Sequence, residues 1–414
     1  MDGQNQELNS SVADTFVIPA LRIDLFFLNE QTKALIDRAT RDRRLIRSKS
    51  HVYEGGIKAA IDLYQKKSTP NLIVIENNDE PELLFPALDR LAEECLPDTR
   101  VIIISNQNDV SLYRQLINRG VTDEVTFPFR PIDLIEAIAA AWKNESNPRI
   151  GRLIAFIGAR GGAGSSTVGH NVAGAMARSF DTDVLLADLD LQMGTVGIDF
   201  DVDGSYGMND VLKSGARLDE VLLERTVLKY DEKLEILASE TNLNSSLELQ
   251  ADAIEKLINL AQTTPRHVIL DLPRTWGEET KKALISADQI VITATPDLTS
   301  LRNTKQISEY LRQARPNDDM PILVMNQVGQ PRRPEIAITE FCEAVRLNEG
   351  HSIPYNSSIF GRAANSGRIV TYSNERSSVA SAFRDIAEDL LNPGMRNKPV
   401  SIKRKLVHFM RKWW

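Results

Sequence analysis

Short apolar runs alternate along this 414-residue chain with longer segments of helical periodicity, and this alternation constrains the fold most. The pattern is typical of α/β units built around parallel sheets. The runs fall into two sets, separated by a polar, proline-containing stretch near 141–150. The sequence therefore predicts an α/β protein of two domains, each a doubly wound parallel sheet, with the larger one second.

The expected strands and boundaries follow from these runs. Strands are predicted at 23–28, 71–76, 100–105 and 123–129 in the first set, and at 152–159, 183–190, 233–240, 266–273, 289–296 and 321–328 in the second. The predicted organisation is a flexible N-terminus at 1–19, a first domain at 20–140, a linker at 141–150, a second domain at 151–391, a linker at 392–400 and a tail at 401–414.

Charge and cysteine content exclude some classes of protein. The net charge of −8 and the pI near 5.4 disfavour a surface built for nucleic acid, so no specific nucleic-acid partner is expected. Cys95 and Cys342 lie far apart, which predicts neither a disulfide framework nor a cysteine metal knuckle. The polar, acidic start and the lack of a run of about 18 apolar residues predict a cytoplasmic protein.

A glycine-rich loop follows the first expected strand of the second domain, in the stretch FIGARGGAGSSTV at 156–168. It stands between a strand-like and a helix-like segment, the context in which loop amides and a helix N-terminus bind phosphates. The usual loop places a lysine after its last glycine, whereas Ser165 follows Gly164 here. Two alternatives stay open: a loop that binds a nucleotide without this lysine, and a fold that binds none.

Polar residues end several strands of the second set. Asp188 and Asp190 close one strand, Asp271 another and Asn326 a third. Because the carboxyl ends of parallel strands meet at one edge, these side chains are expected to converge on the loop. Carboxylates can hold magnesium through water and orient an attacking water, and an asparagine amide can bond an adenine edge.

These motifs resemble those of the ParA/MinD family of deviant Walker ATPases over about 151–391, including IPYNSSIFGRAANSGRIV at 353–370. With the preceding domain, GARGG and AANSGR, the chain is most similar to pilus assembly ATPases of the CpaE/TadZ type. The resemblance implies a homodimer that uses ATP and Mg²⁺ and positions the Tad (Flp) pilus machinery, its partner proteins, at the cell pole.

The resemblance also assigns roles to residues. Asp190 would orient the hydrolytic water, and Arg160 stands where the family's signature lysine reaches across the dimer. Asn326 would read adenine and Thr167 would contact the α-phosphate. The full set would be Gly161, Gly162, Ala163, Gly164, Ser165, Ser166, Thr167 and Asn326 for the nucleotide, and Ser166, Asp188 and Asp271 for the metal.

The missing lysine bears on turnover. Losing a charge-assisted hydrogen bond costs about 1.5–3 kcal/mol, and the transition state needs positive charge most at the β/γ bridge. Weak or absent hydrolysis is therefore expected, and an active partition-type ATPase on membrane or DNA is the alternative.

The first domain resembles a response-regulator receiver over about 20–140, but its chemistry differs. Glu76 stands where receivers carry the phosphoryl-accepting aspartate, and Phe127 where they carry a lysine. Leu28, Asn29 and Glu30 replace the acidic residues that hold magnesium, and only Ser105 fits. We expect a scaffold kept as an interaction surface that accepts no phosphoryl group. The alternative is Glu76 as a permanently charged stand-in for a modified aspartate.

The tail SIKRKLVHFMRKWW at 401–414 has the pattern of a basic amphipathic helix. Its apolar side would carry Ile402, Leu406, Phe409, Met410 and Trp413, and its basic side Arg404, Lys405, Arg411 and Lys412. This pattern favours an anionic membrane surface, and therefore a peripheral position at the inner membrane. A solvated basic end and a helix that docks on a pilus protein are the alternatives.

Overall fold

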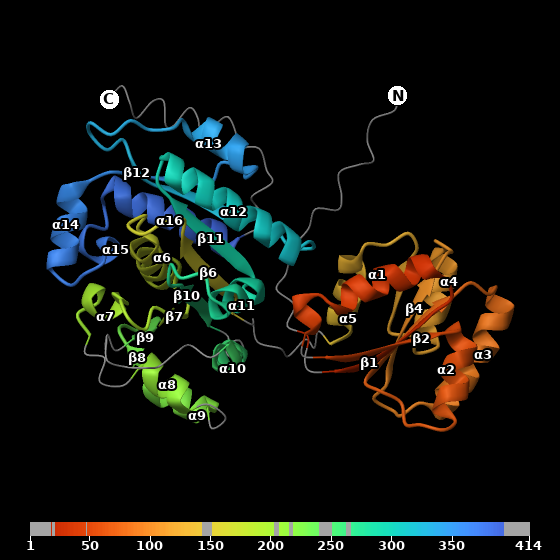
Figure 1. Ribbon diagram of the computed structural model, residues 1–414. Helices are drawn as coiled ribbons and strands as arrows, with labels where there is room; N and C mark the ends of the chain where they lie inside the picture. Colours follow the sequence, from red (N-terminus) through yellow and green to blue (C-terminus); the bar gives the residue numbers. More distant parts are fainter. Residues whose placement is uncertain are drawn as a thin grey trace. The chain divides into compact units, whose positions relative to one another are not determined.

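The computed structural model describes residues 18, 21–46, 48–142, 151–202, 207–214, 218–239, 251–261 and 266–392. The described residues fall into two compact units, within 16–148 and within 149–414, and each contains its own sheet (Figure 1). The expected flexible N-terminus at 1–19 lies outside the described residues except for Ile18, which is buried in the core of the first unit. Most of both linkers and the tail at 401–414 also lie outside the described residues. Within the described ranges, every helix is too short or too polar to cross a membrane.

The first unit is a five-stranded parallel sheet with the strand order β2-β1-β3-β4-β5. This is the flavodoxin-like order of doubly wound sheets, in which ligand sites lie beyond the carboxyl ends of the strands. Its elements are β1 (Arg22–Phe27), α1 (Glu30–Thr40), the 3₁₀ helix η1 (Arg43–Leu45), β2 (Lys49–Glu54), α2 (Gly56–Tyr64), β3 (Leu72–Asn77), α3 (Pro81–Glu94), β4 (Arg100–Ser105), α4 (Val110–Asn118), β5 (Asp123–Thr126) and α5 (Pro131–Ala141).

The core of the first unit lies on both faces of its sheet. In β3 every residue is buried, and successive side chains face opposite sides. Leu72 and Val74 pack with residues of α1 and α5, while Ile73 and Ile75 pack with residues of α2, α3 and α4. The sequence prediction of helices on both faces of this sheet is confirmed.

The edge strand β2 was not predicted from the sequence. Its segment KSHVYE is polar and partly exposed, because an edge strand has a neighbour on one side only and needs few apolar residues. Buried Asp24 of β1 accepts a hydrogen bond from Tyr64 Oη at 2.9 Å and lies 3.1 Å from His51 Nδ1. These contacts help to hold β2 beside β1.

The second unit contains an eight-stranded sheet with the order β13-β12-β11-β6-β10-β7-β9-β8. All neighbouring strands are parallel except β8, which runs antiparallel to β9. The sheet is therefore mixed, whereas the sequence analysis expected only parallel strands. Its strands are β6 (Leu153–Gly158), β7 (Val184–Asp188), β8 (Leu228–Lys229), β9 (Leu234–Leu237), β10 (His267–Asp271), β11 (Gln289–Ala294), β12 (Ile322–Val328) and β13 (His351–Pro354).

Helices cover both faces of the second sheet (Figure 1). The helices are α6 (Ser165–Phe180), α7 (Val196–Asp199), α8 (Met208–Ser214), α9 (Glu220–Thr226), α10 (Ala251–Ala261), α11 (Glu278–Ser286), α12 (Leu298–Ala314), α13 (Ile338–Val345), α14 (Ser357–Asn365), α15 (Val370–Ser373) and α16 (Ser378–Leu391). Along β6, Leu153 and Ala155 pack with the core of α8 to α13, and Ile154 and Phe156 with that of α6 and α16. The central strand β6 is therefore buried on both sides, and its carboxyl end leads into the glycine-rich loop.

Candidate nucleotide-binding site

The glycine-rich loop connects β6 to α6 in a conformation that needs glycine. Gly162 and Gly164 have φ values of 78° and 86°, in the left-handed region that other residues rarely adopt. Gly164 is also the N-cap residue of α6, and a Cβ there would collide with Asn326 Nδ2. The first amides of α6 have no acceptor within the helix, and a helix N-terminus attracts anions. The loop therefore has the geometry of a phosphate cradle.

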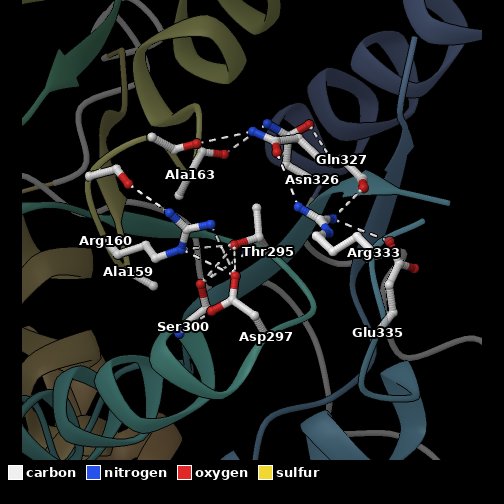
Figure 2. A network of polar contacts seen from close by, with 12 residues as sticks. Ala159, Arg160, Ala163, Thr295, Asp297, Ser300, Asn326, Gln327, Arg333 and Glu335 are labelled. Carbon is white, nitrogen blue, oxygen red and sulfur yellow. Dashed lines mark hydrogen bonds and ion pairs between the residues drawn. The ribbon is translucent and has the colours of Figure 1, made fainter. Parts of the chain in front are cut away.

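Two side chains of β12 hold this loop from one side (Figure 2). Buried Asn326 donates from Nδ2 to the carbonyl of Ala163 at 2.8 Å, and Gln327 donates from Nε2 to the carbonyl of Gly162 at 3.0 Å. Gln327 has a φ of 58°, and Arg333 donates to its carbonyl at 2.6 Å. Asn326, which was expected to bind adenine, therefore holds the loop in its observed conformation through this hydrogen bond.

Arg160 is bound to its own chain on the other side of the loop (Figure 2). Its guanidinium lies 3.1 Å from Asp297 Oδ2 and also donates to Thr295 Oγ1 at 3.2 Å and to the carbonyl of Gly161 at 2.9 Å. Burial raises the pKa of Asp297, but hydrogen bonds from Thr295, the Ser300 amide and Arg160 outweigh this and lower the pKa below its usual value. In this conformation the charge of Arg160 is neutralised within the chain.

Two of the predicted carboxylates, Asp188 and Asp271, end neighbouring strands, and Asp190 lies two residues beyond the end of β7. Asp188 and Asp271 are paired in register on neighbouring strands β7 and β10, and both are buried. Asp188 accepts a hydrogen bond from the Asp190 amide at 2.9 Å, and Asp190 accepts one from the Met193 amide at 3.0 Å. Burial, followed by the negative charge of Asp271, raises the pKa of Asp188 to about 8. Two buried carboxylates side by side create a local demand for positive charge.

His170, which the sequence analysis did not select, places a positive charge beside Asp271. His170 of α6 is fully buried, with Nδ1 2.7 Å from Asp199 Oδ2 and Nε2 3.2 Å from Asp271 Oδ2. Burial lowers the pKa of His170, but the hydrogen bonds to these two carboxylates outweigh it and raise the pKa to about 10. The imidazolium therefore joins the carboxyl end of β10 to the short helix α7.

Two buried oxygen atoms near the glycine-rich loop have no hydrogen-bond partner and would suit a phosphate-bound magnesium ion. Asp271 Oδ1 and Ser165 Oγ are buried and make no hydrogen bond. Among the described residues, no three His, Cys, Asp or Glu side chains are arranged to hold a metal by themselves. Mg²⁺ in nucleotide sites takes one or two protein ligands and completes its shell with phosphate oxygens and water. Ser166, Asp271 and Asp188 are the residues here that would hold it.

The corresponding edge of the first unit is closed by its own carboxylate. Glu76 at the end of β3 is buried and accepts hydrogen bonds from the amides of Leu28, at 2.6 Å, and Asn29, at 3.3 Å. It also accepts hydrogen bonds from the Asn29 side chain and from Thr32 Oγ1, at 2.9 Å for the latter. Ser105 donates to the carbonyl of Gln107 and to the Glu124 carboxylate. Glu76 thus ties the start of α1 to β3.

Several residues of the loop's surroundings were not predicted. Asp297, Gln327 and Arg333 contact the loop or its supports from distant segments, so only the folded chain brings them there. A weak signal existed for His170, because it stands four residues after Ser166 and therefore on the same face of the helix.

Comparison with known proteins agrees with this geometry. Residues 151–322 match the AAA_31 family model, described as an AAA domain. Septum site-determining protein MinD of Bacillus subtilis is 26% identical over 189 residues, which are 43% of this chain and 66% of MinD. ParA family protein pGP5-D of Chlamydia psittaci is 24% identical over 166 residues, 38% of this chain and 62% of its own length. The chain thus spans less than two thirds of these relatives.

Solved structures show the fold of the second unit. A ParA family ATPase from Chlorobium tepidum superimposes with a TM-score of 0.52 at 22% identity, covering 58% of this chain and 99% of that protein. A pilus assembly protein CpaE from Caulobacter crescentus is 39% identical over 31% of this chain and 97% of its own. Its TM-score is 0.30. The second unit therefore has the α/β fold of the ParA and MinD P-loop proteins, and the AAA_31 match at residues 151–322 lies within it.

Proposed function

We propose that this protein is an ATP-binding, dimerising localisation and assembly factor with weak or absent hydrolysis. The observation that carries the proposal is the loop itself. Gly162 and Gly164 give it the left-handed turns of a phosphate cradle at the N-terminus of α6, beside the unpartnered oxygens of Ser165 and Asp271. A bound Mg²⁺ would neutralise phosphate charge, and this chain's residues would position the nucleotide.

In this proposal, ATP binding stabilises a homodimer. Arg160, now bonded to Asp297, would exchange that carboxylate for the phosphates of the partner subunit's nucleotide. ATP would shift the monomer–dimer equilibrium only to the extent that it binds the dimer more tightly than the monomer. With Ser165 in the lysine position, ATP binding is retained better than hydrolysis.

The cellular role rests on the resemblance of GARGG, AANSGR and the preceding receiver-like domain to pilus assembly ATPases. We infer that the partners are proteins of the Tad (Flp) pilus machinery and that the protein is cytoplasmic, held at the inner membrane or cell pole. The basic tail at 401–414, outside the described residues, would contribute contacts to anionic lipid.

An active ParA/MinD-type ATPase is the second candidate. It is favoured by the carboxylates at the strand ends, because Asp190 could orient a water while Asp188 and Asp271 support the metal. The two candidates differ in turnover and not in nucleotide binding, so one set of measurements separates them.

The test combines binding, association and turnover on the full chain. We expect equilibrium dialysis to show Mg²⁺-dependent ATP binding, and sedimentation to show a dimer with ATP but not with ADP or without nucleotide. Phosphate release should be close to background, and a steady release would favour the active ATPase. Identical oligomer distributions in all three conditions, with no bound nucleotide, would refute the proposal.

A further inference from the structure

Arg274 is an exposed arginine in the segment that follows β10, three residues after Asp271. Its guanidinium makes no hydrogen bond or ion pair with any residue that the structure describes. An arginine can form two parallel hydrogen bonds with phosphate oxygens. Arg274 therefore carries a positive charge that the folded chain does not use.

The guanidinium of Arg274 lies against the glycine-rich loop. A Cβ built on Gly161 would be 2.8 Å from one terminal nitrogen of Arg274 and 3.9 Å from its Cζ. Gly161 and Arg274 are both exposed, so this contact lies at the surface of the second unit. A side chain at position 161 would therefore displace the guanidinium of Arg274.

The loop lacks its usual lysine, and two other basic side chains near it are paired with carboxylates. Ser165 replaces the lysine of the usual loop, and Arg160 is 3.1 Å from the carboxylate of Asp297. His170 is buried between two carboxylates beneath the loop. Arg160 and His170 thus have carboxylate partners, whereas Arg274 has none among the residues that the structure describes.

We propose that Arg274 binds the terminal phosphates of a nucleoside di- or triphosphate in its own chain and takes the place of the missing loop lysine. The inference rests on the proposed nucleotide binding and adds the residue that makes a lysine-free loop workable. The ligand class is set by the polyphosphate, because a nucleoside monophosphate offers no terminal phosphates for this contact.

The experiment measures binding of fluorescent ATP, ADP and AMP to the full chain with Mg²⁺, with inorganic pyrophosphate as a competitor. The variants are Arg274→Ala, Arg274→Lys and the control Arg346→Ala. Arg346 is also exposed. It precedes the parallel strand β13, so it lies where the strands begin, whereas the glycine-rich loop lies where they end. Loss of one charge-assisted hydrogen bond corresponds to a roughly 10- to 100-fold weaker affinity.

We expect Arg274→Ala to weaken ATP, ADP and pyrophosphate binding by this factor, to leave AMP nearly unchanged, and Arg274→Lys to retain part of the affinity. A second change supplies a rescue. Ser165→Lys in the Arg274→Ala chain should restore ATP binding, because both positions then serve the same phosphates.

Three results would overturn the inference, and they are distinguishable. If Arg274→Ala binds ATP as tightly as the wild type and Arg346→Ala, Arg274 is not a phosphate ligand. If it loses ATP-dependent dimerisation at unchanged affinity, it contacts the partner subunit instead. If the wild type binds neither ATP nor pyrophosphate, the proposed function itself fails and this inference with it.

Discussion

Replacement of buried His170 by alanine tests the polar link between α6, β10 and α7. The change removes two charge-assisted hydrogen bonds, at 2.7 and 3.2 Å, and leaves the buried carboxylate of Asp271 without its cation. Removing one member of a buried ion pair costs about 3–5 kcal/mol of folding free energy. A matched control is His351→Ala, whose 2.8 Å contact with Asp389 is partly exposed and should cost only about 0.2–1 kcal/mol.

The pH dependence of this loss follows from the raised pKa. The folded chain keeps a proton on His170 up to about pH 10, whereas the unfolded chain releases it near 6.5. The stabilisation is therefore complete below pH 6.5 and decreases by about 1.4 kcal/mol per pH unit as the pH rises toward 10. The difference in unfolding free energy between wild type and His170→Ala should narrow accordingly.

Urea unfolding of the full chain, followed by pulsed hydrogen exchange and mass spectrometry, measures this loss. Peptides from α6 and β10 report on the second unit, and peptides from β3 in the first unit serve as an internal reference. A loss no larger than that of His351→Ala, or a difference that stays constant between pH 7 and pH 9.5, would refute the reasoning.

Four further predictions concern other parts of the two units. Glu76→Gln replaces one accepting carboxylate oxygen by an NH2 group that must face donors of Leu28, Asn29 or Thr32, so the first unit should lose about 1–3 kcal/mol of unfolding free energy in the same urea assay. The wild type should keep its mass after incubation with acetyl phosphate, because a glutamate stands where receivers carry the phosphoryl-accepting aspartate, and a stable adduct in residues 20–140 would contradict this. The pKa of Asp188 near 8 means that metal binding must displace a proton, so Mg²⁺ affinity in calorimetry with ATP should rise with pH up to about 8; an affinity that is flat between pH 6 and 8 would be evidence against it. Asp297→Ala removes the carboxylate partner of Arg160 and leaves only its hydrogen bonds to Thr295 and Gly161, so ATP-dependent dimerisation in sedimentation should tighten, and weaker association would show that the ion pair is needed for dimerisation.

The sequence predicted the parts of the fold that depend on apolar runs and local signals. The expected strands were confirmed where both faces are buried, as in β3 and β6, because such runs are strongly apolar. The edge strands β2, β8 and β13 were missed, since short or polar segments at an edge carry little periodic signal. The antiparallel β8 depends on a hairpin to β9 and makes the sheet mixed.

The candidate site was predicted to a similar depth. Gly162, Gly164, Asp188 and Asp271 could be located because strand ends and glycine spacing are local features, whereas their roles stay predictions. The contacts that restrain the loop come from residues such as Asp297, far away in the chain. Their functions depend on tertiary neighbours, and spacing alone does not reveal those neighbours.

The close contact between α6 and α15 limits which residues can change independently. A Cβ at Gly174 would come within 2.8 Å of the Tyr372 ring and would also collide with the Ile369 side chain. Asn171, three residues earlier, accepts a hydrogen bond from the Thr371 amide at 3.0 Å. Substitutions at position 174 should therefore appear in related chains only together with smaller side chains at 369 and 372. This coupling would be visible as covariation between segments that are far apart in the sequence.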